Sequence, residues 1–261
     1  MTIEPFPIRF SSLPAGDGVI RVLRDDCLDG GTKQRALHPF LLDCLDKGYR
    51  EFVYASPFSG FAQVALSYAC RELGVPCHIF ADTDPSNAQS EFTEHAATAE
   101  ARRAGARVTL TATLDEAETK AAHWEKNNSS CYKPPLGLDC ESYRRYLKEA
   151  VTKVWESMVA EQRPYPKRLW VSLGSGTLSG ILRSVVPVET QLCCVNVHVL
   201  DAKDARIQRV EKLPNTRVFS ATETFAERSR FVPPIPSNCH YDAKVWAFIH
   251  GQASMGDVWW N

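Results

Sequence analysis

The stretch LRDDCLDGGTKQRAL, residues 23–37, joins a strand pattern to a helix pattern and decides the fold. The apolar run Val19 to Leu23 favours a pleated backbone because Val and Ile are strand formers. From Lys33 onward, Ala36, Leu37 and Phe40 recur at helical spacing. Acidic and glycine residues separate the two patterns, so the sequence predicts a strand, a turn and a helix.

The turn places a lysine at the start of the predicted helix. Thr32 is predicted to cap the helix, and Gly30 and Gly31 allow the backbone to approach a group above the helix start. Lys33 is thereby positioned to point its amine into a cleft. The alternative is a solvated lysine in the first turn of a surface helix.

Strand and helix patterns alternate downstream of this turn. Such alternation predicts an α/β fold with a parallel sheet covered on both faces and ligand-binding loops at the strand ends. The expected strands are 52–55, 77–81, 106–112, 169–173 and 193–200, and the expected helices are 62–73 (ended by Gly74), 97–104, 114–124, 140–160 and a closing helix around 245–249. Residues 127–139 are predicted to be a hinge or linker, and residues 201–230 give no clear pattern.

The strand Leu169–Leu173 runs directly into Gly174-Ser175-Gly176-Thr177. A strand, a turn of small residues and a helix start gather backbone N–H groups at the positive end of a helix dipole, which favours phosphate binding. The alternative is a tight turn that needs small residues only for packing. A Walker loop is excluded because Gly-Lys-Ser/Thr is missing, and a third glycine of a dinucleotide fingerprint is absent.

Composition narrows the class of protein. The 261 residues, 44% hydrophobic and 23% charged, can form one large domain or two packed lobes. A net charge of −1 gives no electrostatic case for nonspecific nucleic-acid binding. No apolar run reaches the roughly 20 residues of a membrane span. Nine scattered cysteines without zinc spacing predict reduced thiols, no metal site and a cytoplasmic protein.

Four motifs together resemble a known enzyme family: Arg24-Asp25-Asp26, Gly30-Gly31-Thr32-Lys33, the glycine turn at Gly174, and Tyr241-Asp242-x-Lys244. They look like the pyridoxal-phosphate enzymes of fold type II, the tryptophan-synthase-β-like family. Within that family they are most similar to the aminocyclopropane-carboxylate deaminase and D-cysteine desulfhydrase branch. The resemblance implies two packed parallel-sheet lobes with pyridoxal 5'-phosphate in the cleft between them. Residues 1–50 and 127–261 are then expected to form the larger cofactor-binding lobe, and 51–126 the smaller lobe.

The resemblance also implies roles for individual residues. Lys33 corresponds to the lysine that forms the Schiff base with the cofactor. Asp242 corresponds to the acid that faces the pyridine nitrogen, and Ser59 and Tyr241 join Lys33 as candidate catalytic residues. The cofactor phosphate is expected at Gly174, Ser175, Gly176 and Thr177.

The chemistry of these residue types agrees with those roles. A lysine in a partly desolvated cleft has a lowered pKa and can condense with an aldehyde, and the cofactor then acts as an electron sink. An acid such as Asp242 keeps the pyridine ring protonated, which favours deamination, racemisation or decarboxylation through a carbanion. The alternative role for Asp242 is a cap for the last predicted helix.

The sequence departs from the family pattern in ways that affect the predicted substrate. Gly60 and Phe61 follow Ser59 where the family has Asn and then His or Gln, and Ala36 replaces a second lysine of the desulfhydrase branch. The chain is also compact for the family between Thr177 and Tyr241, which suggests an open site for a large substrate.

The sharpest functional hypothesis is decarboxylation of an amino acid attached to a larger molecule, such as a modified thymine in phage DNA. Deamination or β-elimination on a small free amino acid is the alternative within the family. Two further alternatives are a non-catalytic binding protein of the same fold and a nucleotide-binding α/β protein. The expected partners are an amino-acid-bearing substrate and a second copy of the chain, as a homodimer, without a membrane.

Overall fold

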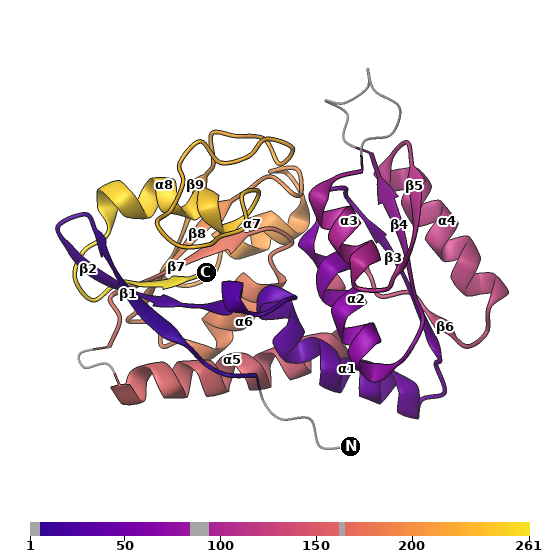
Figure 1. Cartoon of the computed structure of the whole chain (residues 1–261). Helices are drawn as coiled ribbons and strands as arrows, with labels where there is room; N and C mark the ends of the chain where they lie inside the picture. Colours follow the sequence, from indigo (N-terminus) through magenta and orange to yellow (C-terminus); the bar gives the residue numbers. More distant parts are fainter. Residues whose placement is uncertain (1–5, 84–93, 162–164) are drawn as a thin grey trace. The chain divides into compact units, whose positions relative to one another are not determined.

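The computed structural model describes residues 6–83, 94–161 and 165–261. The chain divides into two compact units, each built around its own sheet (Figure 1). Unit 1 contains residues 29–146, and unit 2 contains residues up to 28 together with 147–261. The long helix α5 (Glu141–Glu161) begins in unit 1 and ends in unit 2.

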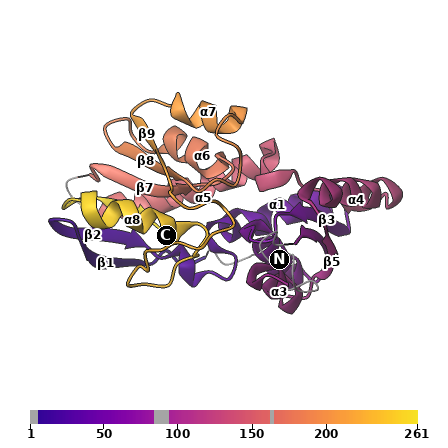
Figure 2. The same ribbon diagram turned by 90° about the horizontal axis from the view of Figure 1, so that it is seen from above.

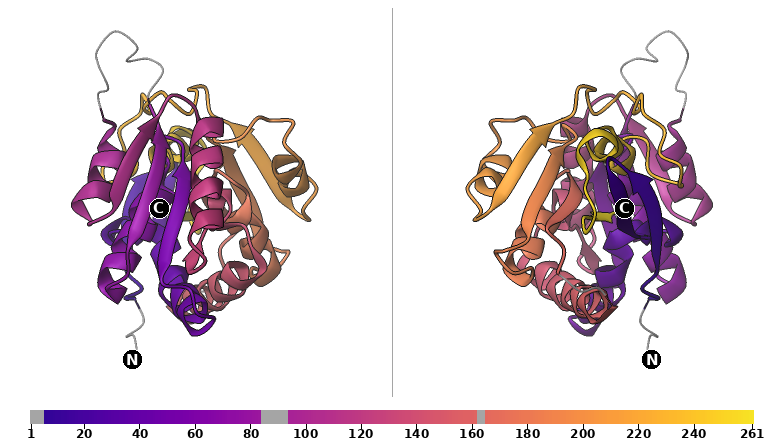
Figure 3. Two further views of the ribbon diagram at one scale, coloured as in Figure 1. Left: turned by 90° about the vertical axis from the view of Figure 1, so that its right-hand side faces the viewer. Right: turned by 90° about the vertical axis from the view of Figure 1, so that its left-hand side faces the viewer.

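Unit 1 contains a four-stranded parallel sheet in the order β5-β4-β3-β6 (Figure 3, left). Parallel neighbours require crossover connections, and helices between the strands supply them. The strands are β3 (Glu51–Ser56), β4 (Cys77–Asp82), β5 (Arg107–Thr111) and β6 (Cys131–Tyr132). The helices are α1 (Gln34–Asp46), α2 (Phe61–Leu73), α3 (Ala96–Arg103) and α4 (Leu114–Asn127).

Both faces of the unit 1 sheet are covered. Val53, Ala55 and Phe80 pack with Ala117 and Ala121 of α4. Phe52 and Tyr54 alternate with these residues along β3 and are also buried, so they occupy the opposite face. Helix α2 contacts β3 and β4, and α1 packs on α2.

Unit 2 contains a six-stranded sheet in the order β1-β2-β10-β7-β8-β9. The hairpin of β1 and β2 is antiparallel, and every other pair is parallel (Figure 3, right). The strands are β1 (Phe10–Ala15), β2 (Gly18–Leu23), β7 (Arg168–Leu173), β8 (Gln191–Asn196), β9 (Thr216–Ser220) and β10 (Val258–Trp260). Strand β10 completes the sheet by pairing with both β2 and β7.

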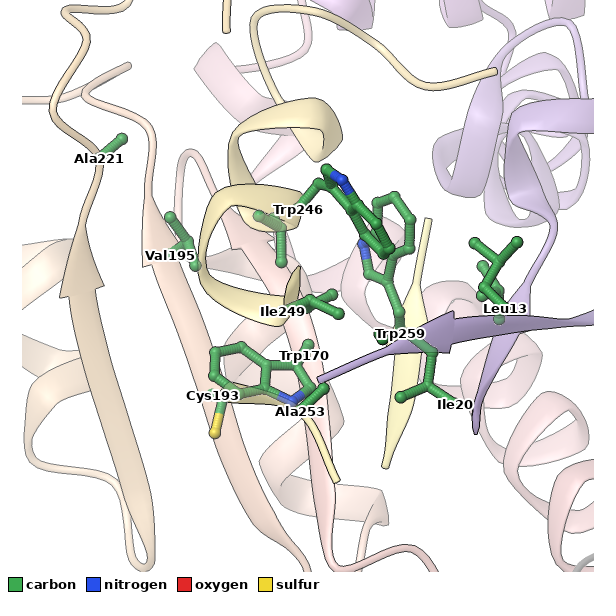
Figure 4. Close-up of a cluster of buried hydrophobic side chains, with 13 residues drawn as sticks. Leu13, Ile20, Trp170, Cys193, Val195, Ala221, Trp246, Ile249, Ala253 and Trp259 are labelled. Atoms are coloured by element: carbon green, nitrogen blue, oxygen red, sulfur yellow. The ribbon is translucent and has the colours of Figure 1, made fainter. Parts of the chain in front are cut away.

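One face of the unit 2 sheet packs on α8 (Asp242–Gln252). Trp246 and Ile249 of this helix join Trp170, Val195 and Trp259 in a buried cluster (Figure 4). The rings of Trp246 and Trp259 stack with centroids 5.7 Å apart. Helix α6 (Thr177–Val185) packs against β7 and β8, and α7 (Ala205–Glu211) packs against β9 (Figure 2).

The structure confirms the predicted α/β class and corrects several predicted elements. The predicted linker at 127–139 contains β6, which pairs with β3, and the unclear region 201–230 contains α7 and β9. The last predicted helix does not close the fold, because β10 follows it. The predicted strand 193–200 ends at Asn196, and His198 then adopts a positive φ of 65° that ends the extended backbone.

The compact units do not follow the predicted lobe bounds of 1–50 with 127–261, and 51–126. Residues 29–50 and 127–146 group with 51–126, because α1 packs on α2 and β6 pairs with β3. The cofactor-binding role assigned to the larger lobe stays a prediction. All nine cysteines are free thiols, and within the described residues no helix is both long and apolar enough to cross a membrane.

Candidate functional site

Lys33 lies at the junction between a short 3-10 turn, Gly31–Lys33, and helix α1. It is half-buried, and its carbonyl oxygen accepts a hydrogen bond of 3.4 Å from the hydroxyl of Tyr143. Tyr143 is almost fully buried, and burial raises the pKa of its hydroxyl far above the usual range. Its hydroxyl therefore stays protonated and donates to the backbone of the lysine turn.

Gly30 and Gly31 are each required by the structure, but for different reasons. A Cβ at Gly30 would lie 2.8 Å from the Cα of Ala65, so Gly30 permits close approach of the turn to helix α2. Gly31 has a φ of +59°, a region that L-residues rarely adopt. Both glycines were predicted to let the backbone approach a group above the helix start, and the close approach that Gly30 permits is to helix α2.

The predicted helix cap at Thr32 is also wrong. Thr32 lies inside the 3-10 turn, and α1 has Lys33 at its N-cap without a side-chain cap. The turn is closed instead by Gln34, whose Oε1 accepts a hydrogen bond of 2.8 Å from the amide of Gly30. The Nε2 group of Gln34 donates to Glu72, and Glu72 also pairs with His38. These three side chains tie the lysine turn to helix α2.

Ser59 lies in the loop between β3 and α2 and is 1% exposed. Its Oγ has no hydrogen-bond partner among the described residues, and neither does Oε1 of the fully buried Gln63. Gly60 is the N-cap of α2, where a Cβ would lie 2.7 Å from Ser56 Oγ and 2.9 Å from Pro57 O. The tight loop therefore excludes a side chain at the position where the family has Asn.

Phe61 stands directly after this loop. A Cβ added at Gly31 would lie 3.4 Å from the ring of Phe61. The start of α2 thus brings an aromatic side chain against the glycine that precedes Thr32 and Lys33. The α2 helix and the lysine turn form one packed arrangement within unit 1.

The glycine turn in unit 2 connects β7 to α6. Gly176 is the N-cap of α6 with φ 83° and ψ −9°, a left-handed conformation that favours glycine. Since glycine has no side chain, it cannot cap the helix, and the first N–H groups of a helix have no intrahelical acceptor. The hydroxyls of Ser175 and Thr177 lie 3.0 Å apart over this turn. The arrangement presents hydroxyls and helix-start amides, the groups that bind anions.

Tyr241 and Asp242 lie beside the glycine turn. A Cβ at Gly174 would lie 3.2 Å from the ring of Tyr241, so ring and turn are in close contact. Asp242 is the first residue of α8, and its Oδ1 accepts a hydrogen bond of 2.7 Å from the hydroxyl of Ser172 on β7. The carboxylate therefore lies at the positive end of the α8 dipole and has a hydroxyl donor beside it. Asp242 follows the N-cap residue Tyr241, so it is not the cap of α8.

The structure therefore brings the glycine turn, Tyr241 and Asp242 together within unit 2. Lys33 and Ser59 belong to unit 1, where the lysine turn packs against the helix that follows Ser59. No cluster of three or more metal-ligating side chains occurs in the part of the chain that the structure describes. Sequence reasoning missed Ser172, although a polar residue in the otherwise apolar run Leu169–Leu173 was the available signal.

Comparisons by sequence and by structure give different results. No family model matches the chain, and no curated protein matches it. Its fold, in contrast, is shared with several solved enzymes.

A homologue of aminocyclopropane-carboxylate deaminase superposes with a TM-score of 0.71 at 13% identity, covering 98% of this chain and 88% of its own. The apo form of Escherichia coli diaminopropionate ammonia lyase gives 0.64 at 11% identity, covering 98% and 81%. A mutant of O-ureido-L-serine synthase with O-ureido-L-serine bound gives 0.66 at 15% identity, covering 97% and 85%. Another structure of the Escherichia coli lyase holds an aminoacrylate–pyridoxal-phosphate intermediate.

These similarities confirm the predicted tryptophan-synthase-β-like fold, that of the pyridoxal-phosphate enzymes of fold type II. Nearly the whole chain superposes on each of these three proteins. At identities of 11–15% the likeness concerns the path of the backbone, so roles for individual residues must be argued from the geometry of this chain.

Proposed function

We propose that this protein is a pyridoxal-phosphate-dependent lyase that acts at the α-carbon of an amino-acid moiety. The observation that carries the proposal is the adjacency of Gly174–Thr177 and Tyr241-Asp242 in unit 2. The cofactor needs an anion-binding turn at its phosphate and an acid at its pyridine nitrogen. Here strand β7 leads into the turn, and Ser172 of the same strand donates a hydrogen bond to Asp242. The shared fold with pyridoxal-phosphate enzymes supports the proposal.

The residues of the turn suit the cofactor phosphate. None of Gly174, Ser175, Gly176 and Thr177 is acidic, and the turn ends in the N-terminus of the nine-residue helix α6. Backbone amides and two hydroxyls can donate to phosphate oxygens, and the helix dipole favours the negative charge. The positive φ of Gly176 explains why glycine is needed there.

The remaining residues suit the reacting end of the cofactor. When bound, pyridoxal phosphate supplies an electron sink for negative charge on the α-carbon of the substrate. We assign to Lys33 the covalent attachment of the cofactor through Nζ and the movement of a proton at the α-carbon. The carboxylate of Asp242 holds a proton on the pyridine nitrogen.

Ser59 and Tyr241 are assigned positioning or proton-transfer roles. Ser59 Oγ is buried and has no partner among the described residues, so a polar group of the substrate can complete its hydrogen bonding. Burial of an unpaired hydroxyl is otherwise unfavourable. The ring of Tyr241 forms a wall against Gly174, and Phe225 packs edge-on against it with centroids 5.3 Å apart.

Deamination or β-elimination of a small amino acid is the favoured reaction. Two of the enzymes that share this fold are named as a deaminase homologue and an ammonia lyase. A second candidate is decarboxylation of an amino acid attached to a larger molecule, such as thymine in DNA. The observation in its favour is the short stretch between Thr177 and Tyr241, which is compact for the family and suits an open site, whereas a net charge of −1 argues against a DNA partner.

The test begins with cofactor binding. The protein is reconstituted with pyridoxal phosphate, reduced with borohydride and digested, and the modified peptide is identified by mass spectrometry. Modification of Lys33 is expected, and modification of another lysine, or of none, would contradict the proposal.

Substrate panels then separate the reactions. Ammonia with an oxo acid identifies deamination of a free amino acid, and carbon dioxide released from amino-acid-modified DNA identifies the second candidate. The predicted homodimer is checked by light scattering on the same sample, and the predicted cytoplasmic location by fractionation of cells that express the protein.

A further inference from the structure

Ser172 is the polar exception on one face of β7. Residues alternate between the two faces of a strand, so Trp170 and Ser172 share a face. Trp170 belongs to the buried cluster that packs on α8 (Figure 4). An apolar residue at position 172 would suit that packing, yet the chain has a hydroxyl there.

The hydroxyl of Ser172 is directed to the first residue of α8. Its Oγ donates to Oδ1 of Asp242 across 2.7 Å. A carboxylate is an acceptor only, whereas a hydroxyl can donate, so the polarity of this bond is fixed while Asp242 is ionised. Because β7 is a strand within the unit 2 sheet, the donor is held on a rigid element.

Strand β7 also positions the glycine turn. Strand β7 ends at Leu173 and leads directly into the turn Gly174–Thr177. Ser172 and Gly174 are thus two residues apart, one in contact with Asp242 and the other with Tyr241. Ser172 therefore links the Asp242 carboxylate to the strand that leads into the turn.

We propose that Ser172 is a positioning residue that fixes the orientation and the charge of the Asp242 carboxylate relative to the glycine turn. This inference rests on the proposed function, in which Asp242 holds a proton on the cofactor nitrogen. Removing the hydroxyl leaves the Asp242 carboxylate with one hydrogen-bond donor fewer. The proton on the pyridine nitrogen is then held less firmly.

The experiment compares Ser172→Ala with Ser184→Ala in the cofactor-loaded protein. Ser184 is a matched control because it is exposed on α6 and its hydroxyl donates to the carbonyl of Ile181 in the same helix. Ser172→Ala is expected to retain borohydride trapping at Lys33 and to lower turnover about 3- to 10-fold, the effect of one hydrogen bond. It should also shift the pH midpoint of the bound cofactor's absorbance, which a purely structural role would leave unchanged.

A double-mutant cycle isolates the pair. In an Asp242→Ser background, Ser172→Ala should have no further effect on turnover or on the pH midpoint. Ser172→Thr keeps the hydroxyl, so this single variant should retain the turnover and the pH midpoint of the wild-type protein. Equal losses from Ser172→Ala with and without Asp242, or an unchanged midpoint, would overturn the positioning role. If the wild-type protein shows no trapping at Lys33, the proposed function itself is wrong and the role of Ser172 fails with it.

Discussion

Two glycine-containing turns that look alike in the sequence are built in opposite ways. The turn at Gly30-Gly31 packs against helix α2 through Gly30 and is closed by the side chain of Gln34. The turn at Gly174–Gly176 ends in a glycine N-cap that has no side chain to close it. The first turn therefore uses Gly30 to pack the backbone that carries Lys33 against α2, whereas the second leads into a helix start without a side-chain cap, where we propose that the cofactor phosphate binds.

The comparison shows that glycines in a turn do not by themselves indicate whether the turn binds a ligand or packs against the protein. In unit 1 the atom nearest to a Cβ at Gly30 belongs to the backbone of Ala65, so the contact is internal. In unit 2 the atoms nearest to a Cβ at Gly174 belong to the side chains of Tyr241 and Val199, so this contact is internal as well, and the two turns differ in the uncapped helix start that follows Gly176. Substitutions can separate the two purposes, since one turn should affect stability and the other cofactor affinity.

The largest effect is expected from Lys33→Ala, which removes the side chain that we propose holds the cofactor and keeps the glycines of the first turn. Covalent trapping of the cofactor should disappear completely, while the midpoint of thermal unfolding stays close to that of the exposed control Lys126→Ala. Borohydride trapping and calorimetry measure the two outcomes. Covalently bound cofactor in the mutant would remove Lys33 from the proposed site.

A large effect on affinity is expected from Gly176→Asp. The Cβ would lie 3.2 Å from Val210 and 3.3 Å from the carbonyl of Arg206, at a φ of +83°, and the carboxylate would repel phosphate. Cofactor affinity should fall at least about tenfold, or about 1.4 kcal/mol, because the carboxylate and the phosphate are like charges that would share one anion site. Fluorescence titration with pyridoxal phosphate measures the change.

The control for that variant is Gly180→Asp in the same helix, where a Cβ meets no atom within 4 Å. It adds the same charge without a steric contact and should retain most of the affinity. If Gly176→Asp and Gly180→Asp bind the cofactor equally well, the turn at Gly174–Thr177 is only structural.

A moderate effect on stability is expected from Gly30→Ala. The new methyl group would be forced to within 2.8 Å of the Ala65 backbone, which cannot yield as a side-chain end could. Overpacking of this kind typically costs about 1–3 kcal/mol of unfolding free energy. Gly251→Ala is the control, because a Cβ there meets open space on helix α8. Urea denaturation that ranks the two variants in the reverse order would contradict the packing role of Gly30.

The smallest effect is expected from Gln34→Ala. It removes the acceptor of the Gly30 amide and the link to Glu72, and loss of such a hydrogen bond costs about 1 kcal/mol. The exposed Gln208→Ala in unit 2 should leave the unfolding free energy unchanged within about 0.5 kcal/mol. Equal unfolding free energies for the two variants would show that the Gln34 bonds do not stabilise the lysine turn.

The spacing of apolar residues predicted most of the longer helices and strands. Helix α2 follows from its apolar stripe and from Gly74, whose φ of 67° ends it, and β3 and β4 follow from their apolar runs. The short strands β6 and β10 could not be predicted in this way. They have two and three residues, and their pairing partners are distant in sequence, so no local pattern identifies them.

The candidate site was predictable from the sequence only where it depends on a local pattern of residues, as in the glycine turn. The sequence predicted a turn of small residues between a strand and a helix at 174–177, and the structure places Gly176 there with a φ of 83°. The hydrogen bond of Ser172 to Asp242 joins strand β7 to helix α8. Gln34 accepts from the Gly30 amide because a 3-10 turn precedes α1 and contains Thr32, which was predicted to be the helix cap. Both depend on tertiary geometry that the local sequence does not contain.

Strand β10 has a consequence for the order in which unit 2 can form during synthesis. Residues 258–260 pair with residues 21–23 on one side and with 169–171 on the other. Until they leave the ribosome, the hairpin of β1 and β2 has no hydrogen-bonded connection to β7. Unit 1, encoded between the two segments of unit 2, contains all of its strands by residue 132 and can fold first. The sheet that carries the glycine turn is therefore expected to assemble last, and deletion of residues 258–260 should divide it into two separate parts.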